Sequence, residues 1–422
     1  MSKKSIWIIN QYASTPDTGM GGRHYYLAKE LAKLGHDVHL IAGSYSHLLK
    51  NLPKTSGAYT FEEVDGFKVV WVGVNTYDTA HSKKRIWNWF NFTWKVRKLL
   101  SIIDDPPDVV IASSPQPFAF LAAKYLSKKT GARLVFEVRD IWPLTLIEML
   151  GASRFNPFIA LMQWVEDKAY RESDIVVSNL KHSVGHMVKR GMAAEKFVWI
   201  PNGVCLAEME GGPQAPSDIT AMIPSEDFVV GYTGTIGEAN AIHVLIEAAR
   251  LLKHNHRIKF VLVGDGKEKN SVVRLVESYE LDNVVLLPPV AKCEVPDVLS
   301  RFDVCYIGLL DKPLFRFGVS PNKLFEYFYS GRPVCYAIDS GDYQPVIESS
   351  SGLVAKPEDP SDIARAINEL SLLSEEDRST MGDNGKRHVL KNHQYSHLAA
   401  LLFKAIFTSH KYDVSGGCAN TR

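Results

Sequence analysis

The chain has 422 residues, of which 45% are hydrophobic and 23% charged, so it is long enough for two globular domains. No run of about 18 apolar residues predicts a membrane-spanning helix, and the apolar run at the N-terminus is too short for a signal peptide. The five cysteines are odd in number and lack CxxC spacing. This pattern is typical of reduced thiols, not of a disulfide or zinc framework, and we expect a cytoplasmic protein.

The formal net charge of +1 hides an asymmetry between the two halves. Residues 1–205 carry 26 Lys and Arg against 18 Asp and Glu, a balance of +8, whereas residues 206–422 carry 22 against 29, a balance of −7. A cationic first half indicates that this half alone faces an anionic surface or acceptor. Chance variation between domains is the alternative. We expect no nucleic-acid partner.

Short apolar runs alternate with amphipathic helical stretches along the whole chain. They predict strands at 5–10, 37–42, 68–72, 109–113, 133–138, 175–178 and 197–200, with helices such as 23–34, 118–129 and 158–171. In the second half they predict strands at 228–233, 259–263, 284–287, 304–307, 334–337 and 352–355. Such alternation predicts parallel sheets. Two series predict an α/β protein with two doubly wound, Rossmann-like domains facing a central cleft.

The boundary between the two predicted domains falls in residues 205–227, where Gly211-Gly212-Pro213 and two further prolines interrupt the periodicity. This composition is typical of a linker. The sequence therefore predicts an N-terminal domain at 1–204 and a C-terminal domain at 228–395. We expect a helix at 396–410 to pack back on the N-terminal domain and the polar tail at 411–422 to be disordered.

A glycine-rich turn, Thr18-Gly19-Met20-Gly21-Gly22-Arg23, follows the first predicted strand and leads directly into a helix. Gly21 and Gly22 would let a ligand approach the backbone and the helix N-terminus closely. The turn is neither a P-loop nor a GxGxxG fingerprint, so nicotinamide chemistry loses its main support. A plain flexible turn is the alternative.

The segment from Lys83 to Leu100 combines large aromatic rings with six basic residues. The rings are those of Trp87, Trp89, Phe90, Phe92 and Trp94. Tryptophan and phenylalanine among basic residues are typical of an interfacial helix on anionic lipid, so the segment predicts a peripheral membrane contact. The alternative is a core-packed helix with one exposed basic side.

Charged residues leave an apolar strand in the run Glu137-Val138-Arg139-Asp140-Ile141-Trp142-Pro143. The carboxyl end of a strand is where open α/β sheets bind ligands, so Arg139 and Asp140 are candidate site residues. The same reasoning applies to Ser113-Ser114-Pro115-Gln116-Pro117 after another strand. The alternative is a structural ion pair of Arg139 with Asp140 or with Glu137.

Two glycine turns follow strands in the second half: Gly231-Tyr232-Thr233-Gly234-Thr235-Ile236-Gly237 and Val263-Gly264-Asp265-Gly266-Lys267. Gly234 and Gly266 would let a phosphate meet backbone amides, and Lys267 would add positive charge. A merely solvated surface lysine is the alternative for Lys267.

The run from Gly318 to Pro333 predicts a helix with both ends marked. Ser320 is a predicted N-cap and Pro321 a predicted first helical residue, while Gly331 suits the left-handed position after the last turn.

The start of this helix is polar, with Asn322, Lys323 and Glu326. Free backbone N–H groups, the positive end of the dipole and a lysine form an anion site suited to a diphosphate. The Glu326 carboxylate could accept hydrogen bonds from ribose hydroxyls. An ordinary amphipathic helix is the alternative.

The sequence contains no Asp-x-Asp, no HExxH and no Gly-x-Ser-x-Gly. It therefore supports neither a metal-bridged diphosphate site nor a zinc protease or hydrolase. We expect no metal and no cofactor.

Together these motifs resemble family 4 of the retaining glycosyltransferases, which have the GT-B fold. The resemblance spans nearly the whole chain and includes the helix after Gly22, Ile200-Pro201-Asn202-Gly203-Val204 and Gly331-Arg332-Pro333-Val334. Within that family, the runs 139–143 and 320–327 resemble bacterial surface-polysaccharide transferases (O-antigen, lipopolysaccharide) of the L-fucosamine or N-acetyl-L-fucosamine type.

The resemblance implies transfer of a sugar from a nucleotide diphosphate donor, UDP-linked, to a lipid-linked or oligosaccharide acceptor, with retention of configuration, at the inner face of the plasma membrane. The N-terminal domain would border the acceptor and the C-terminal domain would bind the nucleotide sugar. Arg139, Asp140 and Glu326 are the implied catalytic residues. The implied donor-binding residues are Gly21, Gly22, Gly234, Gly266, Lys267, Gly318, Ser320, Asn322, Lys323 and Glu326.

The chain departs from the family pattern at two places. Gly318 stands where the family has the first of two glutamates, the one associated with the donor sugar. The stretch 235–240 lacks the Arg and Lys that usually hold the diphosphate, so Lys323 and Lys267 are expected to supply the charge.

Two other functions stay open from the sequence. A GT-B epimerase of UDP-N-acetylhexosamine would share the fold, and product analysis with donor alone would reveal it. A non-catalytic two-domain sugar-binding protein is the second alternative.

Overall fold

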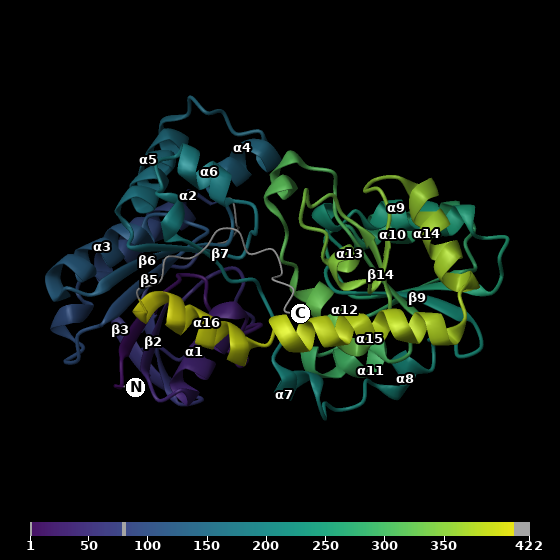
Figure 1. Ribbon diagram of the computed structural model, residues 1–422, viewed down its shortest axis with the longest axis horizontal. Helices are drawn as coiled ribbons and strands as arrows, with labels where there is room; N and C mark the ends of the chain where they lie inside the picture. The colour runs from purple at the N-terminus through teal and green to yellow at the C-terminus, as the bar shows by residue number, and fades with distance from the viewer. Residues whose placement is uncertain (1, 78–81, 409–422) are drawn as a thin grey trace, which may run out of the picture. The chain divides into compact units, whose positions relative to one another are not determined.

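The computed structural model describes residues 2–77 and 82–408. They form two compact units (Figure 1), one ending at Pro201 and the other running from Asn202 to Gln394. Unit 1 also takes in helix α16 (Tyr395–Phe407). The predicted disordered tail at 411–422 lies outside the described residues.

Unit 1 is built on an eight-stranded sheet with the order β3-β4-β2-β1-β5-β6-β7-β8. The strands are β1 (Ser5–Ile9), β2 (Asp37–Gly43), β3 (Tyr59–Val64), β4 (Phe67–Val72), β5 (Val109–Ser113), β6 (Arg133–Val138), β7 (Ile175–Ser178) and β8 (Phe197–Trp199). The α-helices are α1 (Arg23–Lys33), α2 (Lys83–Val96), α3 (Ala119–Thr130), α4 (Leu144–Leu150), α5 (Pro157–Glu172), α6 (Val184–Lys189) and α16. Short 3₁₀ turns lie at Leu99–Ser101 and Ala194–Lys196.

All the strands predicted in the first half are present, but β3 was missed. It pairs antiparallel with β4, whereas the other neighbours in this sheet are parallel. Asp65 and Gly66 join β3 to β4 at φ values of 48° and 83°. An Asp-Gly pair with positive φ is the preferred two-residue hairpin turn, so the signal for β3 lay in the turn.

Unit 2 holds a six-stranded, all-parallel sheet with the order β11-β10-β9-β12-β13-β14. The strands are β9 (Phe228–Thr233), β10 (Ile258–Val263), β11 (Val284–Leu287), β12 (Val304–Gly308), β13 (Val334–Ala337) and β14 (Gly352–Val354). The α-helices are α7 (Leu206–Met209), α8 (Ser217–Thr220), α9 (Ile242–Leu251), α10 (Lys269–Ser278), α11 (Val295–Leu299), α12 (Asn322–Ser330), α13 (Pro345–Ser349), α14 (Pro360–Leu372) and α15 (Glu375–Asn392). Short 3₁₀ turns lie at Glu238–Asn240, Lys292–Glu294 and Pro313–Phe317. The prediction of two doubly wound α/β domains is confirmed.

The segment 205–227 differs from the linker that its composition predicts. It carries α7 and α8, and Ala215, Ile219 and Ile223 are buried in the core of unit 2. The Ala215 amide donates to the Asp297 carboxylate at 3.0 Å. Ile219 of α8 and Ile223, which follows the helix, are buried in the same apolar cluster, so the segment packs on unit 2 instead of bridging loosely.

Helix α16 packs on α1 within unit 1 (Figure 1). Tyr395 stacks on Tyr26 with ring centroids 4.8 Å apart, and Phe403 stacks on His36 at 4.2 Å. In the part of the chain that the structure describes, no helix has the length and apolar character needed to cross a bilayer.

Candidate functional site

The glycine turn of unit 1 leaves the start of α1 open to a ligand. Gly21 and Gly22 have φ values of 65° and 91°, in the region that favours glycine. Gly22 is the N-cap, no side chain caps α1, and its first turn holds no acidic residue. The first amides of a helix lack intrahelical partners, so this end offers backbone donors and the positive end of a dipole to an anion.

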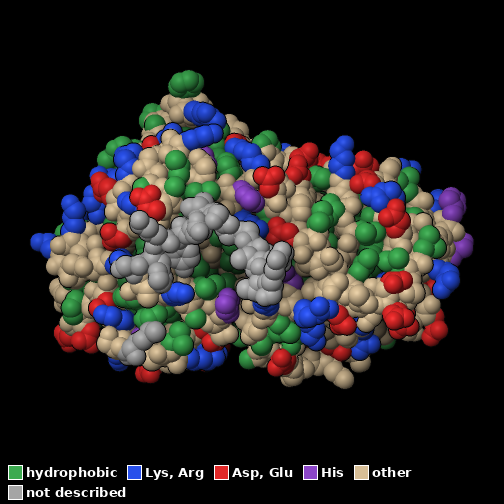
Figure 2. Space-filling model, in the orientation of Figure 1, with side chains coloured by type: hydrophobic (Ala, Val, Ile, Leu, Met, Phe, Trp, Pro, Cys, Tyr) green, Lys and Arg blue, Asp and Glu red, His purple; other side chains and the backbone are tan. Residues whose placement is uncertain are grey.

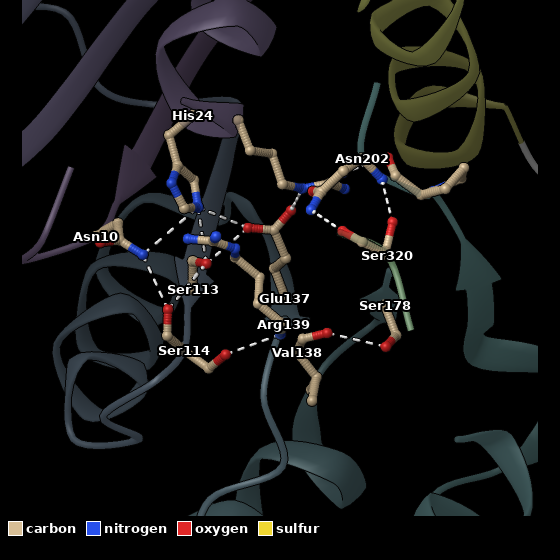
Figure 3. A network of polar contacts seen from close by, with 12 residues as sticks. Asn10, His24, Ser113, Ser114, Glu137, Val138, Arg139, Ser178, Asn202 and Ser320 are labelled. Atoms are coloured by element: carbon tan, nitrogen blue, oxygen red, sulfur yellow. Dashed lines mark hydrogen bonds and ion pairs between the residues drawn. The ribbon is translucent and has the colours of Figure 1, made fainter. Parts of the chain in front are cut away.

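The first two residues of α1 enter a buried polar cluster (Figure 3). Arg23 Nε donates to Glu137 Oε1 at 2.8 Å, and His24 Nε2 lies 2.8 Å from Glu137 Oε2. Ser113 Oγ lies 2.8 Å from His24 Nε2 and donates to Glu137 Oε2 at 2.6 Å. Arg23 also donates through Nη1 to the Pro201 carbonyl at 2.5 Å. Glu137 therefore pairs with Arg23, not with Arg139 as the structural alternative expected.

The charges of this cluster are set by burial and by the ion pair. Burial raises the pKa of Glu137, but Arg23, His24 and Ser113 outweigh it and hold the pKa well below the ordinary value. Burial lowers the pKa of His24, and the attraction of Glu137 only partly offsets this. The result at neutral pH is an ionised Glu137 beside a neutral His24 whose Nε2–H points at the carboxylate.

The same cluster argues against a hydrolytic triad. Ser113 and Glu137 both contact Nε2 of His24, whereas a serine–histidine–acid relay needs one partner on each ring nitrogen. Among the described residues, His24 Nδ1 has no hydrogen-bond partner. His24 is thus held in one tautomer with an acceptor nitrogen available.

Arg139 and Asp140 lie at the end of β6, as predicted. Their backbone amides donate to Ser114 Oγ at 2.8 and 3.2 Å, while Asn10 Nδ2 donates to the Ser114 carbonyl at 2.9 Å. Arg139 Nε is buried without a hydrogen-bond partner among the described residues, and the side chain of Asp140 is exposed. The charge of Arg139 also lowers the pKa of His24, so its guanidinium faces this cluster.

Sequence reasoning missed Arg23, His24 and Asn10 as members of this cluster. The available signal was the register of the sheet: β1, β5 and β6 are neighbours, and a polar residue stands at the carboxyl end of each. Asn10, Ser113 and Glu137 are those residues. Polar side chains at three adjacent strand ends must meet at one edge of the sheet.

In unit 2, Ser320 does not cap α12. Pro321 is the N-cap and no side chain caps the helix, which begins at Asn322. Ser320 Oγ instead accepts from the Asn202 amide at 2.8 Å, and Asn202 Nδ2 donates to the Ser320 carbonyl at 2.7 Å (Figure 3). The buried amide of Asn202 needs an acceptor, and this need outweighs the local capping preference. The predicted end is confirmed, because Gly331 is left-handed with φ 71°.

Lys323 extends from the first turn of α12 toward the glycine turn after β9. Its Nζ lies 2.7 Å from the Tyr232 hydroxyl, 3.4 Å from Asn240 Oδ1 and 4.1 Å from the centre of the Tyr232 ring. No carboxylate of the described chain lies within ion-pair distance of Nζ. Burial lowers the pKa of Lys323 to about 8, although Glu326 opposes this. The ammonium ion is therefore a half-buried cation without a counter-ion.

The glycine turn after β9 leaves space for the Lys323 side chain. A Cβ at Gly234 would lie 3.1 Å from Lys323 Nζ, and Gly234 has φ 125°. A Cβ at Gly264 would lie 1.9 Å from the Gly234 carbonyl oxygen, and one at Gly266 would lie 2.2 Å from the Ile236 oxygen. The two predicted turns thus pack directly against each other, backbone to backbone.

The remaining residues that were predicted to bind the nucleotide sugar differ in solvent exposure. Lys267 and Asn322 are exposed, and it is Lys269 that bonds the Gly264 carbonyl at 3.0 Å. Glu326 is half-buried, and its carboxylate accepts no hydrogen bond from a described residue. Burial foremost raises its pKa, and Lys292 and Lys323 act against that shift.

Gly318 ends the 3₁₀ turn Pro313–Phe317 with φ 91° and ψ 164°. This is a conformation that glycine alone adopts readily. The described residues contain no group of three or more His, Cys, Asp or Glu placed to hold a metal ion.

Comparisons with known proteins agree with this architecture. Residues 18–203 match the family model "Glycosyl transferase 4-like domain", and residues 220–388 match "Glycosyl transferases group 1". The chain is 23% identical over 318 residues to a protein of Escherichia coli K12 named "Putative colanic acid biosynthesis glycosyl transferase WcaI"; the match covers 73% of this chain and 76% of WcaI.

Solved structures are similar in fold. Sucrose-phosphate synthase from Thermosynechococcus elongatus gives a TM-score of 0.74 at 16% identity, covering 95% of this chain and 98% of that one. Anabaena Alr3699/HepE in complex with UDP-glucose gives 0.66 at 16% identity, with coverage of 95% and 98%.

The fold and the two matches define the class: the chain is a glycosyltransferase with the GT-B fold. It contains a glycosyl transferase 4-like domain followed by a group 1 domain.

Proposed function

We propose that the protein is a configuration-retaining glycosyltransferase that uses a nucleotide diphosphate sugar. The observation that carries the proposal is Lys323, a half-buried ammonium ion without a counter-ion, beside the Gly234 turn and at the start of α12. A cation in this setting favours an anion of the size of a diphosphate. Lys323 also reaches Asn240, in the stretch that lacks the family's Arg and Lys, so it replaces that charge from a different element.

The donor that we propose is UDP-linked. HepE, a structural neighbour, was solved with UDP-glucose. Glu326, with no protein partner among the described residues, would accept hydrogen bonds from the ribose hydroxyls. We take the sugar to be an N-acetylated amino sugar of the fucosamine type, on the resemblance of the runs at 139–143 and 320–327.

Catalysis in this proposal needs no covalent intermediate. The leaving diphosphate accepts the proton of the attacking acceptor hydroxyl on the same face of the sugar, and Lys323 stabilises the charge that develops on it. The cluster of unit 1 orients the acceptor: His24 offers Nδ1 as a hydrogen-bond acceptor, and Arg139 and Asp140 supply charges at the end of β6.

We propose that the acceptor is lipid-linked and that α2 brings unit 1 to the cytoplasmic face of the membrane. Helix α2 buries Trp89 and Phe92 but leaves Trp87 66% and Trp94 56% exposed. The side chains of Arg97 and Lys98 lie over the Trp94 ring at 5.2 and 5.9 Å. An outward row of tryptophans among cations suits the interface of an anionic bilayer.

The test is a thermal-shift screen of nucleotides and nucleotide sugars, followed by turnover with lipid-linked acceptors and assignment of the product's anomeric configuration. The proposal expects stabilisation by UDP and its sugars and a product with the donor's configuration. Inversion would refute the retaining mechanism. Epimerised donor formed without acceptor would establish the epimerase instead, and tight sugar binding without any turnover would establish the binding protein.

A further inference from the structure

A second apolar surface of unit 1 lies outside the site and outside α2. It is the corner between α4 and α5, and we call it the α4–α5 corner. Its exposed side chains are Leu150 at 67%, Phe155 at 96%, Leu161 at 40% and Trp164 at 52%. Figure 2 shows hydrophobic side chains at the uppermost tip of the visible face, over the loop that joins the two helices in Figure 1. Large apolar side chains exposed close together in sequence at one corner suggest a contact surface.

Hydrogen bonds fix the shape of this corner. Gly151 ends α4 in a left-handed conformation, and the Ala152 amide bonds the Leu146 carbonyl at 3.1 Å. On the other side, the Asn156 side chain caps α5 by accepting from the Phe158 amide at 2.9 Å. Both helix ends are therefore closed, and Phe155 lies in the short loop between them.

Helix α5, which forms one side of the corner, packs against α2. Trp89 of α2 stacks on Phe158 of α5 with ring centroids 6.0 Å apart, so the two helices share one aromatic core. On α5, Leu161, Trp164 and Lys168 lie three and four residues apart and form one outward row, with the Lys168 ammonium 5.5 Å from the centre of the Trp164 ring. Each of the two helices thus exposes a tryptophan with a cation over its ring, Trp94 on α2 and Trp164 on α5.

We propose that the α4–α5 corner inserts into the interfacial region of an anionic lipid bilayer, with α2 beside it on the headgroups. The inference rests on the membrane-linked acceptor of the proposed function and goes beyond it by assigning a second, apolar anchor. Between Leu144 and Trp164 the only charged residues are Glu148 and Arg154, which suits burial among acyl chains.

Charge complementarity favours lipid over a second copy of this chain. The charge argument rests on α2, which holds Lys83, Lys84, Arg85 and Lys95 and no acidic residue, and on Arg154 next to Phe155. Helix α5 adds no net positive charge, because Lys168 is paired with Glu172 at 2.7 Å. Two such surfaces facing each other would repel, whereas an anionic leaflet would attract each of them.

The test compares full-length variants in co-sedimentation with large vesicles of phosphatidylcholine and phosphatidylglycerol at low and high salt. Phe155→Ser and Trp164→Ser remove the apolar anchor, Lys83→Gln with Lys84→Gln removes charge from α2, and Leu372→Ser is the matched control. Leu372 is 76% exposed on α14 of unit 2. Electrostatic attraction is screened by salt and apolar insertion is not, so the two contributions separate.

We expect Phe155→Ser to lower vesicle binding by about tenfold or more at both salt concentrations, as the loss of one buried aromatic side chain requires. The lysine variant should lose binding only at low salt, and the control should bind like wild type. The proposal is overturned if Phe155→Ser and Trp164→Ser both bind like the control at high salt. It is also overturned if wild type is a dimer that Phe155→Ser dissociates.

The donor reaction is measured separately, by UDP binding and by transfer to a detergent-solubilised acceptor. All these variants should retain both, since none touches the glycine turns or α12. If the corner variants lose vesicle binding but keep normal sugar transfer, the membrane role of the α4–α5 corner is supported. If the wild-type protein binds vesicles but transfers no sugar, only the proposed function is contradicted. Phe155 is almost fully exposed, so its replacement leaves the fold intact, which circular dichroism checks.

Discussion

Lys323 forms no ion pair with a described carboxylate, and its main partner is the hydroxyl of Tyr232. Removing it should therefore cost ligand affinity more than stability. We expect Lys323→Ala to weaken UDP binding tenfold or more, because a charge-assisted contact is worth about 1.5–3 kcal/mol, and to leave uridine binding almost unchanged. Titration calorimetry with both ligands measures this. Lys267→Ala, at an exposed lysine, is the control. If Lys323→Ala lost equal affinity for UDP and for uridine, a contact between Lys323 and the diphosphate would be contradicted.

The same lysine predicts a pH dependence. Its pKa is lowered to about 8 by burial, so the ammonium form is present below pH 8 and is lost as the pH rises through this value. UDP affinity should fall between about pH 7.5 and 9, while uridine affinity stays level. Lys323→Arg keeps its charge over this range, and its affinity should be flat with pH. A wild-type profile as flat as that of the arginine variant would contradict the prediction.

The buried pair of Arg23 and Glu137 should matter for stability. In Glu137→Gln the guanidinium stays buried without its counter-charge, and we expect a loss of about 3–5 kcal/mol in the free energy of unfolding. Denaturant unfolding measures it.

The matched control is Glu166→Gln. Glu166 is also buried in unit 1, but burial raises its pKa to about 8, so it is already neutral at pH 7 and the amide should change little. Because the pKa of Glu137 is lowered in the folded state, its contribution is present above the ordinary carboxyl pKa and is lost as the pH falls through the folded value. Equal stability of both variants at pH 7 would contradict this account.

Among the elements, α2 has two kinds of tryptophan. Trp89 is 4% exposed and donates to the Tyr12 hydroxyl at 2.6 Å, whereas Trp87 is 66% exposed. Trp89→Ala should cost about 3–5 kcal/mol of stability, and Trp87→Ala less than about 1 kcal/mol. Thermal unfolding of the two variants distinguishes them. If both are equally destabilising, the outward row of α2 is part of the core.

Elements that depend on their own local sequence could be predicted, whereas features that depend on residues distant in the sequence could not. Strands such as 109–113 and 133–138 were predicted to the residue, because their apolar runs are buried on both faces. Strand β3 was missed since none of its six residues is fully buried, and only its Asp65-Gly66 turn signals it. Ser320 was assigned as a cap because its competing partner, Asn202, is distant in sequence. The pairing of Arg23 with Glu137 was hidden for the same reason.

For the whole molecule, the asymmetry of charge predicts how it meets a membrane. Residues 1–205 have a balance of +8 and residues 206–422 one of −7. Binding of the full chain to vesicles with anionic lipid should fall steeply from about 50 to 300 mM salt, since the Debye length shrinks to below 8 Å. Binding to pure phosphatidylcholine should barely change. The same salt dependence on neutral vesicles would contradict an electrostatic contribution. Flotation through a density gradient gives the bound fraction for both.

The backbone at Gly318 has a consequence for how sugar selectivity can evolve in this chain. With φ at 91° and ψ at 164°, a glutamate placed here would meet a strain of about 1–3 kcal/mol. A single codon change therefore cannot restore the family's first glutamate without penalty. If this position contacts the donor sugar as we propose, a change of donor preference would have to come from other positions. An engineer who wants the common preference has to transplant the whole loop from 313 to 321, not one side chain.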